Sequence, residues 1–485
     1  MDYGSNVIIR YCEYIHPLMT NYRVETDSMG EVEVSDDALW GAQTQRSLGN
    51  FQISRRTFPP EFIQALIHVK RACAIANKEL GTLPNDIADN IIKASDEILK
   101  EKKFMDQFPL DIYQTGSGTQ TNMNANEVLS NRAIQLMGGQ IGSKKPVHPN
   151  DHVNKGQSSN DIIPTAMHVS TLYELQTKLI PALDQLQAAL KTKQDEFINI
   201  VKIGRTHLQD AVPLTLGQEF SGYVFQLDSA KHHILQTMNL LEQLAVGGTA
   251  VGTGLNAHEE LDKKVCSILS QELNLNFRPD ANKFALIAGK DALVAISGAL
   301  KTLSVALIKI ANDIRLLSSG PRCGIGELIL PENEPGSSIM PGKVNPTQNE
   351  MMVQVAAQVI GNDATITAGG SWGFFELNLM KPVIISNVLE SIYILSNGMS
   401  SFTKHAVTGL KANTDRINSL VGQSLMLVTG LTKDIGYDKA AYIAKKAHKE
   451  NKTIKEVLLE ENIFPADQID AKLDLSKMVH LERMK

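Results

Sequence analysis

The residues best suited to chemistry lie in one short stretch, Gly336–Pro346, which reads Gly-Ser-Ser-Ile-Met-Pro-Gly-Lys-Val-Asn-Pro. It offers two adjacent hydroxyls at Ser337 and Ser338, an ammonium group at Lys343 and an amide at Asn345. Its glycines and prolines disfavour helix and strand, and a helical pattern begins directly after it. Because N–H groups at a helix start attract anions, the stretch is either an ordinary surface turn or one wall of an anion-binding site.

Four further polar loops that contain glycine separate segments with helical periodicity. They span residues 115–126, 148–161, 204–210 and 247–254. Their side chains are mostly neutral hydrogen-bond donors, a set that together with one lysine suits a small anion with several carboxylate oxygens. The candidate side chains of the five loops are Thr119, Asn122, Asn124, His148, Asn150, Ser158, Ser159, Asn160, Thr206, His207, Lys343 and Asn345.

Other kinds of site fit the sequence less well. No Gly-x-x-x-x-Gly-Lys-Ser/Thr motif indicates nucleotide binding, and the loop at 247–254 lacks the preceding strand that a dinucleotide fold needs. His148, Asp151 and His152 come nearest to a metal-binding set, but nothing in the sequence completes it. We therefore expect neither a metal nor a cofactor.

Composition favours an ordinary globular protein in a reducing compartment. Of the 485 residues, 43% are hydrophobic and 21% are charged, and the net charge of −6 argues against a nucleic-acid partner. The four cysteines form no Cys-x-x-Cys pair, and no run approaches the ~18 apolar residues of a membrane span. Residues 1–18 resemble neither a secretory signal nor a transit peptide, so we expect an N-terminal extension and a cytoplasmic rather than a mitochondrial protein.

Long helices must position the loops. Sustained alternating strands are absent, and five amphipathic patterns of about thirty residues each predict an elongated, mainly α bundle. The apolar residues of 285–318 occupy more than one face, so we expect that helix to be buried all round. The wide apolar faces of the bundle favour self-association.

Gly336–Pro346 also matches a family signature, Gly-Ser-Ser-x-Met-Pro-x-Lys-x-Asn-Pro. The chain thereby resembles the fumarase/aspartase superfamily, and within it the class II fumarases, from about Tyr22 into its C-terminal segment. The resemblance implies a mainly α subunit of three domains, with a long central five-helix bundle that forms a twenty-helix core in a homotetramer. It further implies active sites shared by three subunits. We expect the domains at 19–157, 158–412 and 413–485, after the extension 1–18.

Several local features resemble fumarases more closely than aspartases. They are Gly118-Thr119-Gln120, the glycine Gly342 before Lys343, Thr347-Gln348 and Phe375-Glu376-Leu377-Asn378. The resemblance implies a carbon–oxygen lyase that hydrates fumarate reversibly and stereospecifically to (S)-malate in the tricarboxylic acid cycle. An aspartate ammonia-lyase of the same superfamily is the alternative. A catalytically silent scaffold is a third reading, which the presence of Ser337, Lys343 and His207 disfavours.

The family implies a role for each matching residue. The proton-abstracting base would be Ser337, whose alkoxide would need stabilisation by loop amides and nearby positive charge. His207 would act on the hydroxyl side through a water, oriented by Glu350. The aci-carboxylate intermediate carries extra negative charge, so donors must surround it. The implied substrate-binding residues are Ser117, Gly118, Thr119, Asn122, Ser158, Ser159, Asn160, Thr206, Ser338, Lys343, Val344 and Asn345.

A second, outer carboxylate site is implied by the match at His148-Pro149-Asn150-Asp151, together with Lys145. Two departures from the family pattern bear on this region and its surroundings. Lys145 stands where the family often has arginine, so the charge is kept and the bidentate fork is lost. The segment Ser371-Trp372-Gly373-Phe374 is bulkier than is usual for the family. Both affect details of the outer site and the nearby packing.

Overall fold

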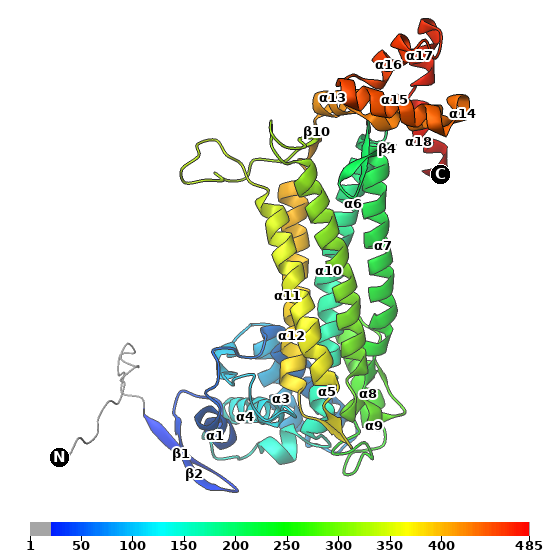
Figure 1. Ribbon diagram of the computed structural model, residues 1–485. Coiled ribbons are helices and arrows are strands. Elements are labelled where there is room, and N and C mark those ends of the chain that lie inside the picture. Colours follow the sequence, from blue (N-terminus) through cyan, green and yellow to red (C-terminus); the bar gives the residue numbers. More distant parts are fainter. Residues whose placement is uncertain (1–20, 485) are drawn as a thin grey trace, which may run out of the picture. The chain divides into compact units, whose positions relative to one another are not determined.

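The computed structural model describes residues 21–484 (Figure 1), so the expected extension 1–18 lies outside the described residues. The chain divides into two compact units. The first unit contains residues up to 170, with 242–290 and 369–386, and the second contains 171–241, 291–368 and 387–485. The three domain boundaries expected from the sequence stay a prediction.

Helices of 6 to 20 residues and two-stranded β-pairs make up the first unit. Its interior is built on α2, whose Phe62, Leu66 and Val69 are fully buried and which packs against α3 and α8. Pro60 starts α2 at a position where proline costs no hydrogen bond. The elements are β1 (Tyr22–Asp27), β2 (Gly30–Ser35), α1 (Ala42–Asn50), α2 (Pro60–Glu79), α3 (Asn85–Leu99), α4 (Thr119–Leu136), β5 (Gln243–Leu244), α8 (Leu261–Leu273), β6 (Arg278–Pro279), α9 (Lys283–Ala288), β8 (Gly373–Phe374) and β9 (Leu377–Asn378).

Long helices lie side by side in the second unit (Figure 1). Helix α7 packs against α6 and α10, and buried polar pairs join the others. Ser297 Oγ on α10 donates to Asp363 Oδ1 on α11 at 2.7 Å, and Asn362 Nδ2 on α11 donates to Ser391 Oγ on α12 at 3.0 Å. The long helices are α5 (Ser159–Glu174), which begins in the first unit, α6 (Ile180–Glu196), α7 (Leu216–Leu241), α10 (Asp291–Leu317), α11 (Thr347–Gly370) and α12 (Lys381–Phe402). The mainly α fold is confirmed.

Helix α10 differs from its expected environment. Leu293, Leu300 and Leu307 are buried, as the pattern predicts, but Val305 on the same helix is 57% exposed. The expectation of burial on every side was therefore wrong for the single chain. By length and composition α10 is also apolar enough to cross a membrane, and 56% of its most apolar window is buried. An apolar face left open by a bundle is the kind of surface that a neighbouring subunit covers.

A β-hairpin replaces the expected loop at 204–210. Strand β3 (Val201–Thr206) pairs antiparallel with β4 (Gln209–Thr215), and Thr206 lies opposite Gln209. The two-residue turn has φ of 55° at His207 and 60° at Leu208. Positive φ at both central residues matches the twist of a hairpin, although neither residue is the glycine or asparagine that favours it. The sequence does not indicate these strands, because each is short and is polar at the end next to the turn.

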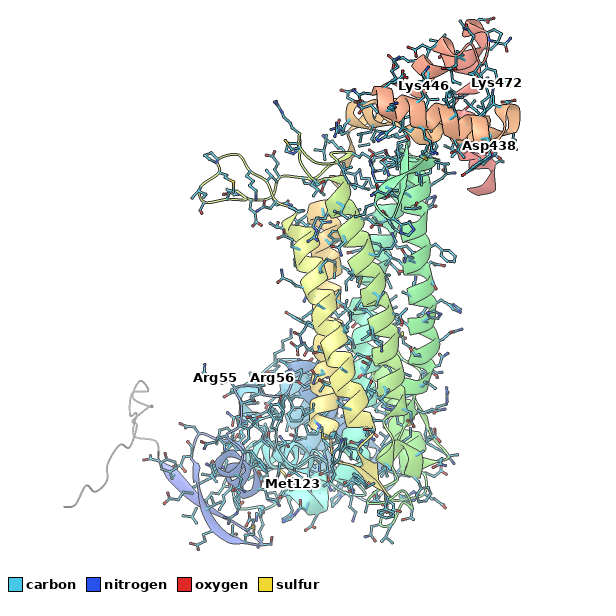
Figure 2. The ribbon with its side chains drawn as sticks, viewed as in Figure 1. Arg55, Arg56, Met123, Asp438, Lys446 and Lys472 are labelled. Atoms are coloured by element: carbon cyan, nitrogen blue, oxygen red, sulfur yellow. The ribbon has the colours of Figure 1, made fainter. Side chains whose placement is uncertain are left out.

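The C-terminal segment folds around a small apolar core of its own. Leu431, Ile443, Val457 and Ile469 are fully buried there. Figure 2 shows Lys446 and Lys472 on its helices, and Lys472 pairs with Asp434 at 2.9 Å. The elements are α13 (Thr414–Gln423), α14 (Thr432–Ile435), α15 (Tyr437–Glu450), α16 (Ile454–Glu460), α17 (Ala466–Lys472) and α18 (Ser476–Val479), with β7 (Leu328–Ile329) paired to β10 (Lys411–Ala412).

Candidate active site

At two helix starts in the first unit, three side-chain hydroxyls are linked by hydrogen bonds into a hydroxyl chain. Thr119 is the first residue of α4 and Ser159 the first of α5. Thr119 Oγ1 lies 2.7 Å from Ser117 Oγ and 2.9 Å from Ser159 Oγ. Gly118, which caps α4, has φ of 78°, a conformation that glycine adopts without strain. The helix dipoles at both starts favour an anion here.

The neighbouring polar side chains belong to the same two helix starts. Asn122 Nδ2 donates to Asn154 Oδ1 at 3.2 Å, and among the described residues the buried Asn122 Oδ1 has no partner. Ser158 Oγ accepts the N–H of Asn160 at 3.2 Å. Asn160 Nδ2 donates to the carbonyl of Ala250 at 2.9 Å, which ties this turn to the loop at 247–254.

A buried carboxylate, which sequence reasoning missed, fixes this arrangement. Asp161 accepts N–H bonds from Ser158 at 2.9 Å, from Gly247 at 3.0 Å and from Thr249 at 2.9 Å. Burial raises the pKa of Asp161 to about 6, although these bonds and the charge of Lys70 oppose the rise. Asp161 therefore holds two of the polar loops together by a fully buried acceptor.

The stretch Gly336–Pro346 closes on itself in the second unit. The N–H of Gly336 donates to the carbonyl of Lys343 at 2.8 Å, and a Cβ on Gly336 would lie 2.5 Å from that oxygen. Lys343 Nζ donates to Asn345 Oδ1, and Asn345 Nδ2 donates to the carbonyl of Gly336, both at 2.6 Å. Figure 1 shows the loop between α10 and α11 projecting from their ends. Ser338, Lys343 and Val344 are exposed.

Ser337 is surrounded by N–H donors. Its half-buried Oγ accepts from the N–H of Met340 at 3.0 Å and from that of Ile339 at 3.3 Å. As a purely structural feature this is a serine turn. Chemically, two fixed N–H groups aimed at one oxygen stabilise an alkoxide more than a hydroxyl, because the charge-assisted bonds are stronger.

Thr206 and His207 are exposed at the tip of the β3–β4 hairpin, over a buried ionic cluster. Arg205 donates two bonds to the fully buried Glu327, at 3.1 and 2.8 Å, and Lys202 lies 3.3 Å from the same carboxylate. Burial opposes the charge on Arg205, but Glu327 outweighs it, so the pKa of Arg205 lies above its ordinary value. The cluster anchors the strand that carries the tip.

Glu350 occupies the first turn of α11 and is exposed. Within the described residues of this chain, no hydrogen bond or ion pair joins it to His207, and none joins either residue to Ser337. The expected His207–Glu350 pairing is thus not formed inside one subunit.

The residues of the expected outer site gather in the first unit. His148 Nδ1 accepts the N–H groups of Asn150 and Asp151 at 3.2 and 3.1 Å, which caps the π-helical turn Pro149–Val153. His148, Pro149 and Asn150 line a cavity of about 230 Å³. The lysine that lines this cavity is Lys144. The expected Lys145 is exposed and is not among the residues that line it.

The candidate residues therefore form two sets. One set, from Ser117 to Asn160 with the outer site, lies in the first unit. The other, with Thr206, His207, the Gly336–Pro346 loop and Glu350, lies in the second. Between residues 21 and 484, no group of three or more His, Cys, Asp or Glu side chains could hold a metal ion.

Comparison with known proteins places this arrangement in a family. Residues 30–361 match a family described as lyase, and residues 427–480 match the fumarase C C-terminus. The mitochondrial fumarate hydratase of Dictyostelium discoideum is 57% identical, with 95% of each chain covered. The class II fumarate hydratase of Nitrosomonas europaea is 56% identical, covering 96% of this chain and 100% of the relative. The crystal structure of class II fumarase from Schistosoma mansoni has a TM-score of 0.92 and 45% identity, with 95% and 99% covered.

The fold, the polar loops and these matches together define a lyase of the fumarase/aspartase superfamily. Within that superfamily, the chain belongs to the class II fumarases.

Proposed function

We propose that this chain is a fumarate hydratase, which adds water reversibly and stereospecifically to fumarate and forms (S)-malate in the tricarboxylic acid cycle. The observation that carries this proposal is the 56–57% identity to fumarate hydratases over nearly the whole chain. A catalytically silent scaffold would be expected to have lost Ser337, Lys343 or His207. All three are present, which argues against that reading.

Ser337 serves as the base that removes the proton next to a malate carboxylate. The proton is weakly acidic, so a serine can take it only as an alkoxide. The two N–H groups aimed at Ser337 Oγ support this role, and Lys343 in the same closed loop adds positive charge. Lys343 and Asn345 then bind the carboxylate on which the extra negative charge develops.

His207 acts on the hydroxyl through a water, and Glu350 of another subunit orients it. The exposure of both side chains and the absence of a contact between them within the described chain support a site completed by assembly. The hydroxyl chain Ser117–Thr119–Ser159 binds the other end of the substrate. The subunits form a homotetramer in which each site combines three of them, and exposed apolar residues such as Val305 on α10 support this assembly.

The substrate is a small dicarboxylate, and neither nucleic acid nor membrane is a partner. The relatives include mitochondrial and bacterial proteins, and we propose the cytoplasm as the compartment of this one. The cavity lined by His148, Pro149 and Asn150 serves as the outer carboxylate site, with Asp151 next to it in the sequence.

The experiment that tests the reaction compares two substrates. The ultraviolet absorbance of fumarate is followed with (S)-malate and then with aspartate. Turnover of malate without turnover of aspartate is expected, because Gly342 and Thr347-Gln348 resemble fumarases. Turnover of aspartate without malate would establish the ammonia-lyase alternative instead.

A further inference from the structure

Three charged side chains are buried beside the segments of the first unit that carry the candidate hydroxyls. Lys70 comes from α2, Asp161 from α5 and Lys381 from the start of α12, and each has an exposed fraction of 0%. Fully buried charges are rare in proteins unless they are paired. Their contacts therefore indicate what they are for.

Both lysines contact neutral acceptors. Lys70 Nζ donates to Asn154 Oδ1 and Gln157 Oε1, both at 2.9 Å. Lys381 Nζ donates to the carbonyl of Asn160 at 3.4 Å, and its own N–H donates to the carbonyl of Gly116 at 3.1 Å. Each lysine thus contacts the segment that carries the candidate substrate-binding residues, without a direct ion pair among the described residues.

The charges in this cluster do not cancel. Asp161 attracts both ammonium groups, but its oxygens are already occupied by three backbone N–H groups. When both lysines are protonated, two ammonium groups face one carboxylate, and one positive charge in the interior is uncompensated. Burial lowers the pKa of Lys70 and of Lys381 to about 7 each, although the charge of Asp161 opposes the fall.

The surrounding titratable groups do not supply the missing negative charge. Burial raises the pKa of the Cys73 and Cys266 thiols, on α2 and α8, to about 12, so both stay neutral. Burial lowers the pKa of His168 on α5 to about 4, so it is neutral as well. Asp262 on α8 is paired with Lys283 at 2.6 Å. A negative charge must therefore come from outside this group.

We propose that Lys70 and Lys381 are positioning residues that hold one carboxylate of the substrate at the start of α5, by a buried positive charge acting through the Gln157–Asn160 turn. This inference rests on the proposed function. Neither lysine touches the substrate; the hydroxyls and amides in front of them do. This buried positive charge favours a dicarboxylate over the same molecule with one carboxylate replaced by a neutral amide. Only a carboxylate at this position compensates the charge.

A pH dependence of binding follows from this arrangement. A bound carboxylate favours the ammonium form of both lysines, so substrate binding takes up protons above neutral pH. The KM for fumarate should therefore rise with pH above about 7, while the proton-transfer groups at Ser337 and His207 govern kcat.

The test replaces Lys381 by methionine, which keeps the volume and removes the charge. For Lys381→Met we expect KM to rise on the order of tenfold and to keep only the part of its pH dependence above neutrality that Lys70 contributes, with kcat changing far less. Lys381→Arg keeps the charge and should restore part of the affinity. The matched control is Lys290→Met, since Lys290 is also buried in the same unit but donates to the carbonyls of Leu286, Ile287 and Gly289.

Two results would overturn the proposal. Lys381→Met could show the same KM and pH profile as the Lys290→Met control, or Lys381→Arg could be as impaired as Lys381→Met, which would indicate a structural role. Should a variant not fold, calorimetry of succinate binding to His207→Asn protein in two buffers gives the proton count. Uptake at pH about 8 is expected, and zero uptake contradicts the proposal. A chain that binds succinate with proton uptake but does not hydrate fumarate would refute the proposed function and not this inference.

Discussion

Replacing Glu327 by glutamine tests how the β3–β4 hairpin positions His207. The glutamine has the same size, but it has one oxygen where the carboxylate has two, and its NH2 group faces a donor of Arg205. The change removes the negative charge that faces Arg205 and Lys202, whose side chains are 16% and 3% exposed. We expect a loss of about 3–5 kcal/mol, the usual cost of removing one partner of a buried ion pair.

The matched control is Glu219→Gln. Glu219 pairs with the same Lys202 at 2.7 Å, but its side chain is 19% exposed and it does not contact Arg205. Because Lys202 keeps Glu327 in that variant, we expect a loss of about 1 kcal/mol.

Urea unfolding followed by circular dichroism compares the two variants with the wild type, and malate turnover is measured on the folded proteins. Glu327→Gln should unfold at distinctly lower urea than Glu219→Gln. Its kcat should also fall by up to about a hundredfold, since a displacement of about 1 Å of a catalytic group has that effect. Equal unfolding midpoints for the two variants would refute the anchoring role of Glu327.

Three further predictions concern catalysis, packing and pH. Ser337→Ala should lower malate turnover by about a thousandfold or more while the assembly measured by ultracentrifugation is unchanged; near-normal turnover would exclude Ser337 as the base. Gly116→Ala should abolish folding at physiological temperature, because its Cβ would lie 1.6 Å from the carbonyl oxygen of Leu379. In the control Gly222→Ala, on α7, the added Cβ meets nothing within 4 Å, so this variant should be neutral or stabilising in a thermal melt. Burial lowers the pKa of Lys381 from 10.5 to about 7, so between these pH values the unfolded chain binds more protons than the folded one and the stability of the wild type rises with pH. Lys381→Met should flatten that rise in urea titrations. An unchanged slope would contradict the burial of a charge at this position.

Local pattern was sufficient to predict the helices and the loops between them. Pro346 marks the start of α11 at Thr347, and the leucine and alanine spacing predicts α7 and α10. The stretch Gly336–Pro346 is irregular, as its glycines and prolines predict. These features depend on residues that are close in sequence, so the sequence exposes them directly.

Buried charges could not be found in the same way. Asp161 and Glu327 look like surface residues in the sequence, because their partners at 247–249 and 202–205 are far along the chain. Lys70 left a weak signal, since it stands on the apolar face of α2 between Leu66 and Cys73.

The wide apolar faces predicted self-association, but local pattern could not tell which side of a helix a neighbouring subunit would cover. The exposed side of α10 reads as buried in the sequence, because apolar residues look alike whether they face the same chain or a neighbour. The expected pairing of His207 with Glu350 is absent from the single chain for the same reason. In the proposed site, these two residues belong to different subunits.

The most direct test of the account mixes two inactive variants. Ser337→Ala and His207→Asn are co-expressed in equal amounts with different tags, and tetramers that carry both tags are purified and assayed for malate turnover. If the two residues of one site come from different subunits, random assembly leaves about two sevenths of the sites intact in tetramers that carry both tags. Turnover near two sevenths of the wild-type value is predicted, and turnover no higher than that of either variant alone would contradict a site shared between subunits.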